Sequence, residues 1–111
     1  MQQPLLVLAV YKAKPGCGEK LTDLVSRKRK YLLENNFVTS RPSVFVNSFN
    51  DPNIFMEIFE WVSQKRIDDA HKDEGVWSFW KEFEVLCDEV GTHLSKLPEA
   101  NEEFPNFKAI N

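Results

Sequence analysis

A chain of 111 residues, 42% of them hydrophobic, is long enough for one domain with a single core and too apolar to be disordered. Its net charge of -3 argues against a general nucleic-acid binder or a protein of anionic membrane surfaces, because both functions use clustered positive charge. The longest apolar run, 5–11, is too short to span a bilayer and lacks signal-peptide features, so we expect a cytoplasmic protein without a membrane partner.

The first half of the chain predicts a strand, a helix and a hairpin. Residues 5–13 form a continuous apolar run, which is typical of a buried strand. Apolar residues recur at helical spacing over 21–33, and the basic run 27–30 in this helix indicates a solvated face or, alternatively, an anion site. The β-branched and aromatic runs 43–49 and 54–61 flank a turn-forming segment and predict a hairpin.

The second half predicts an interrupted helix and a short strand. Ser63 suits a helix start, because its hydroxyl accepts a hydrogen bond from an early backbone N–H, and Gly75 is expected to interrupt that helix. An apolar stripe over 76–90 predicts that the helix resumes and ends at Gly91, which suits a C-terminal cap. Residues 92–97 are expected to form a fourth strand.

The order of these elements, βαββαβ, predicts an α+β, ferredoxin-like sandwich with an antiparallel sheet and helices on one face. We expect one domain over 1–97 and a tail over 98–111 that packs on the domain or on a dimer partner. Residues alternate along the hairpin strands, and both resulting faces are apolar. The alternation does not decide which face meets the helices. Because an exposed apolar face favours aggregation, we expect a second copy to cover the other face in a homodimer.

The pattern Glu60-Trp61-x-Ser63, followed by Ala70-His71, is similar to that of the antibiotic biosynthesis monooxygenase family in the dimeric α/β-barrel superfamily. The resemblance covers 5–97, and the segment from Ala70 to Cys87 more closely resembles an uncharacterised branch. It implies a dimeric α/β barrel with one pocket per subunit between sheet and helices. In some members it also implies oxidation of electron-rich polycyclic phenols by dioxygen without metal or flavin. Haem-degrading members use an asparagine on the first strand, and this chain has none within 5–13.

Oxygenation without a cofactor requires an apolar pocket, a base, and donors that hold the substrate anion. His71 is one candidate base, because an imidazole exchanges protons near neutral pH and its helical neighbours direct it toward the sheet. The alternative is a hydrogen-bonded packing residue. Glu57 is the other candidate, because apolar surroundings favour proton uptake by a carboxylate. Its alternative role is an ion pair with an arginine across the dimer.

Five more residues are candidate substrate contacts. Asn47 and Tyr11 are expected to donate hydrogen bonds, and Trp61 is expected to stack on an aromatic substrate. Phe45 adds an apolar contact, and Trp77, which lies off the helical stripe, is expected to contact a partner or act as a lid. The alternative is plain packing for Trp61 and structural hydrogen bonding for Asn47 and Tyr11.

Two hypotheses of function follow. The first is a monooxygenase-like enzyme that acts on a hydrophobic aromatic small molecule. The second is a non-catalytic dimeric α/β-barrel protein with a small-molecule-binding or stress-related role. The resemblance implies no cofactor. We expect no metal, because the spacing of His71, Asp73 and Glu74 does not place three ligands on one helix face.

Overall fold

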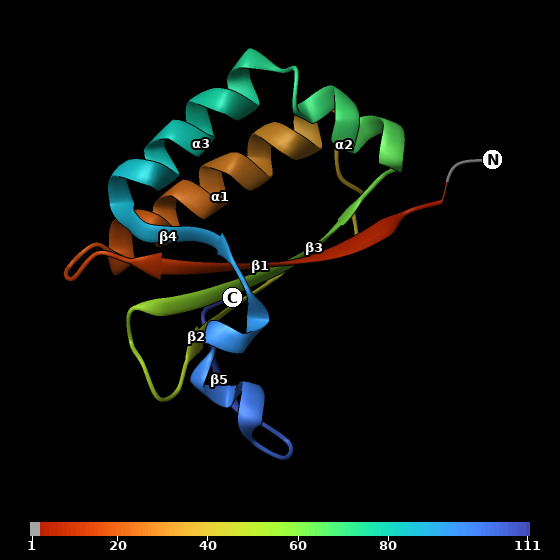
Figure 1. Cartoon of the computed structure of the whole chain (residues 1–111). Helices are drawn as coiled ribbons and strands as arrows, with labels where there is room; N and C mark the ends of the chain where they lie inside the picture. Colours follow the sequence, from red (N-terminus) through yellow and green to blue (C-terminus); the bar gives the residue numbers. More distant parts are fainter. Residues whose placement is uncertain (1–2) are drawn as a thin grey trace.

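Within residues 3–111, which the computed structural model describes, five antiparallel strands form one sheet and three α-helices lie on one of its faces (Figure 1). The strand order is β4-β1-β3-β2-β5, so β3 is central and the sheet is open. This arrangement confirms the predicted α+β, ferredoxin-like fold. The elements are β1 (Leu5–Ala13), α1 (Gly18–Glu34), β2 (Val44–Ser48), β3 (Ile54–Trp61), α2 (Gln64–Ala70), α3 (Glu74–Leu86), β4 (Cys87–Thr92) and β5 (Phe107–Ala109), with short 3-10 helices η1 (Leu94–Lys96) and η2 (Pro98–Asn101) before β5.

Several local predictions are confirmed. Helix α1 stops before Asn36, whose positive φ of 59° does not continue a right-handed helix. The backbone of Ser63 is extended, and its hydroxyl accepts a hydrogen bond from the Arg66 N–H at 3.2 Å, which caps α2. The predicted hairpin pairs β2 with β3, with Val46 opposite Met56.

The break between α2 and α3 lies at 71–73, so the predicted interruption at Gly75 is wrong by a few residues. The Asp73 carboxylate accepts hydrogen bonds from the Val76 N–H at 3.0 Å and from the Tyr31 hydroxyl at 2.5 Å, and it thereby starts α3. Gly75 lies inside the first turn of α3, where the Tyr31 hydroxyl occupies the space of a side chain.

The predicted fourth strand over 92–97 is also wrong, because β4 begins directly after α3 at Cys87 and ends at Thr92. The chain becomes extended there because it pairs with β1, which satisfies backbone groups that β1 would otherwise leave open. Gly91 is not a helix cap. It has a φ of 62° and lies where the β1–β4 register shifts between Val10 and Tyr11, as in a β-bulge.

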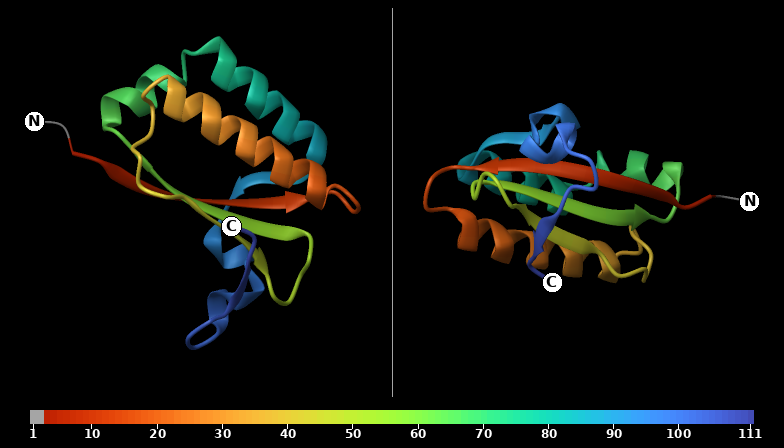
Figure 2. Two further views of the ribbon diagram at one scale, coloured as in Figure 1. Left: turned by 180° about the vertical axis from the view of Figure 1, so that it is seen from behind. Right: turned by 90° about the horizontal axis from the view of Figure 1, so that it is seen from below.

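The two faces of the sheet carry different side chains. The helix-facing side is rich in aromatic residues, and α1 and α3 cover them. The outer face is aliphatic, and Leu97 packs on part of it, on the side where residues 94–111 lie (Figure 2). The main helix-facing residues are Tyr11, Phe45, Phe55 and Phe59, and the buried outer ones are Val10, Val46, Ile54 and Met56.

A buried carboxylate anchors the C-terminal segment, which we define as residues 94–111. Glu99 is 1% exposed and accepts hydrogen bonds from the Ser48 hydroxyl at 2.9 Å and from the backbone N–H groups of Phe49 at 2.8 Å and Asn50 at 3.2 Å. Strand β5 then pairs with the edge of β2. The segment therefore extends the sheet by one strand and covers one end of its outer face.

The other end of the outer face is open. Leu6, Leu8 and Val44 are 59%, 47% and 44% exposed, and register pairing places Leu8 and Val44 on either side of Ile58. We call these four residues the open patch. Among residues 3–111, no helix has the length and apolar character needed to cross a membrane.

Candidate functional site

A cavity of about 200 Å³ lies between the sheet and helices α1 and α3. Most of its lining is apolar or aromatic, as in sites for hydrophobic small molecules. Two polar side chains take part in the lining, Tyr11 from β1 and Lys28 from α1. The lining residues are Val7, Ala9, Tyr11, Lys28, Leu32, Phe59, Trp61, Val76, Trp80, Phe83, Val90 and Gly91.

Tyr11 and Lys28 meet the carboxylate of Glu57, which comes from the central strand. The Tyr11 hydroxyl donates to Glu57 Oε1 at 2.9 Å, and Lys28 Nζ donates to the same oxygen at 2.5 Å. Lys28 Nζ also lies 3.4 Å from the Tyr11 hydroxyl. Glu57 is 1% exposed and Lys28 is 4% exposed, so this is a buried ion pair with a tyrosine attached. We call the three residues the buried triad.

Aromatic rings surround the charged part of the buried triad. Lys28 Nζ lies 4.6 Å from the centroid of the Phe59 ring and 5.4 Å from that of Phe83, within the range of cation–π attraction. The Tyr11 ring stacks on Phe83 at 4.8 Å. Burial, and next the negative charge of Glu57, raise the pKa of Tyr11 well above its ordinary value. Tyr11 is therefore a neutral hydrogen-bond donor at physiological pH.

Trp61 is the third predicted site residue at the cavity. It lies at the end of β3, lines the cavity, and packs in a tilted orientation on Phe59 with 5.3 Å between ring centroids. The structure thus brings together three of the seven residues singled out in the sequence, with Tyr11 and Trp61 in the lining and Glu57 bonded to Tyr11.

His71 lies at the exposed C-terminal end of α2, outside the cavity lining. Its Nδ1 is 2.8 Å from the carbonyl oxygen of Ile67, and its ring packs edge-on against Trp80 at 5.2 Å. Trp77 is exposed on α3, packs on Trp80, and donates its indole N–H to the carbonyl of His71 at 2.6 Å. His71 and Trp77 both pack on Trp80, which lines the cavity, and neither belongs to the lining itself.

Asn47 and Phe45 lie away from the cavity. The Asn47 side chain donates to the carbonyls of Pro52 at 3.1 Å and Ile54 at 2.8 Å, which fixes the β2–β3 turn. Phe45 is buried under α1 and stacks on Phe55 at 5.6 Å.

The sequence interpretation missed Lys28. The sequence predicts that the basic run 27–30 is a solvated helix face or, alternatively, an anion site. For Lys28 the solvated face is wrong, because this side chain is buried against Glu57. The signal is present in the helical spacing: Lys28 falls on the same face as Leu21, Leu24 and Leu32, which are all buried. A lysine on an apolar stripe indicates a buried carboxylate partner, since an unpaired buried charge is strongly destabilising.

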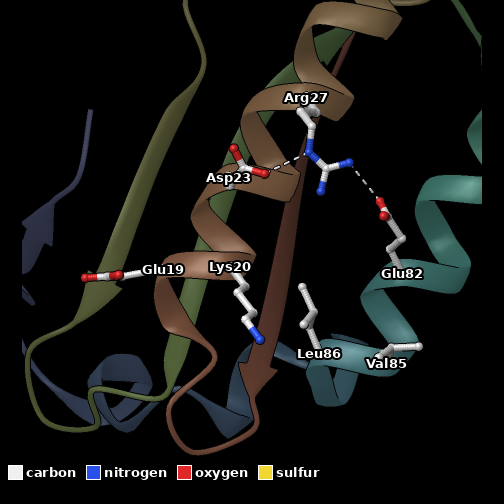
Figure 3. A pocket seen from close by; sticks show the side chains of 7 residues that line it. All are labelled: Glu19, Lys20, Asp23, Arg27, Glu82, Val85 and Leu86. Carbon is white, nitrogen blue, oxygen red and sulfur yellow. Dashed lines mark hydrogen bonds and ion pairs between the residues drawn. The ribbon is translucent and has the colours of Figure 1, made fainter.

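A larger groove, of about 490 Å³, lies on the surface between α1 and α3 (Figure 3). Arg27 bridges Asp23 at 2.8 Å and Glu82 at 3.0 Å across it, and all three side chains are about half exposed or more. Exposed ion pairs of this kind contribute little energy and are open to water. The groove holds no buried polar group, so we place the candidate site in the smaller cavity.

Comparison with known proteins identifies the fold. No family model and no curated protein sequence matches the chain. Among solved structures, protein SO0527 from Shewanella oneidensis superimposes with a TM-score of 0.66 at 13% identity, over 81% of this chain and 86% of that one. A provisionally assigned antibiotic biosynthesis monooxygenase from Nitrosomonas europaea gives 0.65 at 9% identity, over 86% and 95%.

A NIPSNAP-family protein from Agrobacterium tumefaciens gives a TM-score of 0.57 at 12% identity, over 79% of this chain and 87% of that one. These neighbours confirm, at the level of the fold, the resemblance stated from the sequence. Identities this low show a shared architecture and leave the reaction to be argued from the site.

Proposed function

We propose that this protein is a monooxygenase-like enzyme that acts, without a cofactor, on a hydrophobic aromatic small molecule bound in the cavity of about 200 Å³. The observation that carries the proposal is the buried triad, which gives an apolar cavity a carboxylate, an ammonium group and a hydroxyl in mutual contact. A purely structural core has no need of an ion pair there, since apolar residues of similar size are often at least as stabilising.

The chemistry follows from the groups present. A base removes a proton from the substrate, and the resulting anion is electron-rich enough to reduce dioxygen. If a substrate CH₂ group becomes a carbonyl, one oxygen atom of O₂ enters the product and the other leaves as water, so the substrate supplies all the electrons. Glu57 is the proposed base, Tyr11 the donor beside it, and Trp61 the aromatic wall.

We also propose that two copies of the chain associate through the outer faces of their sheets. The open patch leaves three aliphatic side chains about half exposed or more, and the C-terminal segment does not reach them. Sheet faces pack well on one another, and a two-fold pair buries the same patch of both copies.

Oxygen uptake with a panel of naphthols and naphthalene tests the enzymatic proposal. We expect uptake only with the hydroxylated compounds, and Glu57→Gln is expected to lower kcat/KM by about 10²–10⁴-fold, as for loss of a general base. His71→Ala is the matched comparison between the two candidate bases. Because His71 contacts the cavity only through Trp80, its loss is expected to change kcat/KM by less than about tenfold.

The opposite ranking of these two variants would move the role of base to His71. If the compounds bind, as native mass spectrometry would show, but no oxygen is consumed by any of them, the second hypothesis is favoured. The protein would then be a small-molecule-binding barrel in which the buried triad only recognises its ligand.

A further inference from the structure

We propose that a proton transfer moves the negative charge of the buried triad from Glu57 to the ligand. Glu57 takes a proton from the ligand through Tyr11, and Lys28 pairs with the ligand oxyanion that results. This deepens the proposed function, on which it rests, and it defines the ligand as a small neutral compound with a weakly acidic hydroxyl, a phenol or an enol.

The positions of the three groups define the route of the proton. Tyr11 and Lys28 line the cavity, whereas Glu57 is reached through them. A ligand hydroxyl therefore meets the Tyr11 oxygen first. A tyrosine hydroxyl has one donor and two acceptor sites. The Tyr11 hydroxyl donates its proton in a hydrogen bond to Glu57 at 2.9 Å, and one of its acceptor sites faces Lys28 at 3.4 Å, which leaves the second acceptor site for the ligand.

The transfer moves two protons and no other atoms. The ligand O–H bond breaks as its proton binds the Tyr11 oxygen, and the original Tyr11 proton moves to Glu57 Oε1. The electron pair of the broken bond stays on the ligand oxygen. Before the step the cluster holds one ammonium and one carboxylate; after it, one ammonium and one ligand oxyanion. Because the number of buried charges is unchanged, no additional charge has to be desolvated.

The same charges exclude other ligand classes. A cationic ligand would lie beside the ammonium group of Lys28, which carries the same charge. A ligand that enters as a carboxylate would place two anions, itself and Glu57, against one ammonium group. Among the described residues around Tyr11, the other titratable side chain is the thiol of Cys87, and burial raises its pKa to about 11, so it stays neutral. Only a neutral acid leaves the cluster with one positive and one negative charge both before and after the proton transfer.

The cavity also limits the size of the ligand. Pockets for drug-sized molecules are typically about 300–1,000 Å³, and a cavity of about 150 Å³ takes benzene. A volume of about 200 Å³ therefore fits one ring or two small fused rings. Larger polycyclic compounds do not fit without movement of the walls.

Titration of bound 4-nitrophenol tests the proposal, because its anion absorbs visible light and its neutral form does not. We expect the apparent pKa of nitrophenol to fall by at least about one unit on binding, so that the ratio of its anionic to its neutral form at a given pH rises at least about tenfold. Nitrobenzene, which has no hydroxyl, measures the cavity alone. The double variant Lys28→Met/Glu57→Gln removes both buried charges together and is expected to bind nitrobenzene and lose the shift.

Tyr11→Phe is expected to bind nitrobenzene and lose most of the shift, because the relay is cut while the ion pair remains. Lys30→Met, an exposed lysine of the same helix, is the control and keeps the full shift. Binding of nitrophenol by the native protein with an unshifted pKa overturns the proposal and leaves the proposed function standing on the cavity. Failure of the native protein to bind either compound overturns both. If the double variant does not fold, the nitrophenol titrations of Tyr11→Phe and of the native protein still test the proposal.

Discussion

Lys28 places a positive charge in the core, at a position where a leucine would match the apolar face of α1. Its ammonium group has one carboxylate partner, Glu57, at 2.5 Å, and the faces of Phe59 and Phe83 on the other sides. Removing one member of a buried ion pair leaves the other uncompensated, whereas removing both does not. The two residues are therefore coupled in stability as well as in chemistry.

We predict that Lys28→Met lowers the free energy of unfolding by about 3–5 kcal/mol, because Glu57 is left charged in an apolar site. Adding Glu57→Gln is expected to recover much of that loss. Urea denaturation measures both changes, and Lys30→Met, on the exposed side of α1, is expected to change stability by less than about 0.5 kcal/mol. Additive losses in the double variant would contradict the coupling.

Alternation along β3 predicts which of its residues share a face of the sheet. Period-two counting groups Glu57 with Trp61, and both lie on the helix-facing side with Phe59, but the alternation alone does not show that this face meets the helices. The prediction that His71 faces the sheet is wrong: His71 is exposed because it is the residue at which α2 ends, and a helical stripe indicates a buried position only while the helix continues. The break depends on the hydrogen bond from Tyr31 to Asp73, a contact between residues far apart in the sequence.

At the scale of elements, the C-terminal segment is fixed by Glu99 rather than by a large apolar surface. Burial raises the pKa of the Glu99 carboxyl, but hydrogen bonds from Ser48 and the backbone outweigh it and lower this pKa below the ordinary 4.5. A lowered folded-state pKa means that the carboxylate form stabilises the docked segment above pH 4.5. That stabilisation is lost as the pH falls through the folded-state value.

We therefore predict that acidification below pH 4.5 loosens β5 before it unfolds the rest of the sheet. Hydrogen exchange of the β5 amides, followed against pH, measures this. Glu99→Gln is expected to weaken docking by about 1–3 kcal/mol at neutral pH and to flatten the acid response. Glu103→Gln, an exposed carboxylate of the same segment, is the control. An unchanged acid response in Glu99→Gln would assign the effect to other carboxylates.

The elements that the sequence did not predict are those whose pattern is ambiguous or short. Cys87 and Val90 continue the helical stripe of α3, yet they belong to β4, because pairing with β1 is a non-local interaction that spacing does not reveal. Strand β5 has three residues, too few for an alternation to be visible. By contrast, the positions of α1, β1 and the hairpin were predicted correctly. The expected burial of β1 is wrong for its first half, where Leu6 and Leu8 are exposed.

At the scale of the whole molecule, the two sheet faces are covered unequally. Helices α1 and α3 bury most of the aromatic side chains on one face, while the C-terminal segment covers only part of the other and leaves the open patch. Aliphatic side chains gathered on one face mark an interaction surface more often than a neutral surface. The proposed homodimer rests on this incomplete coverage of the outer face.

We predict that the native protein sediments as a dimer and that Leu8→Glu sediments as a monomer, because the variant places a charge in the centre of the open patch. Val85→Glu is the matched control: this valine is also exposed, but it lies on α3, on the helical side of the sheet. Analytical ultracentrifugation distinguishes the states. A native monomer would overturn the proposed dimer, and dissociation by Val85→Glu alone would place the interface on the helical side of the sheet.

The three tryptophans of the chain all lie in the cavity lining or in contact with it. Trp61 and Trp80 line it, and Trp77 packs edge-on against Trp80 at 4.9 Å. The intrinsic fluorescence of the protein therefore originates at the candidate site, with no background from tryptophan elsewhere in the sequence. A compound that enters the cavity is therefore expected to change the tryptophan emission of the unlabelled chain. This emission can be used to screen compounds before any reaction has been identified.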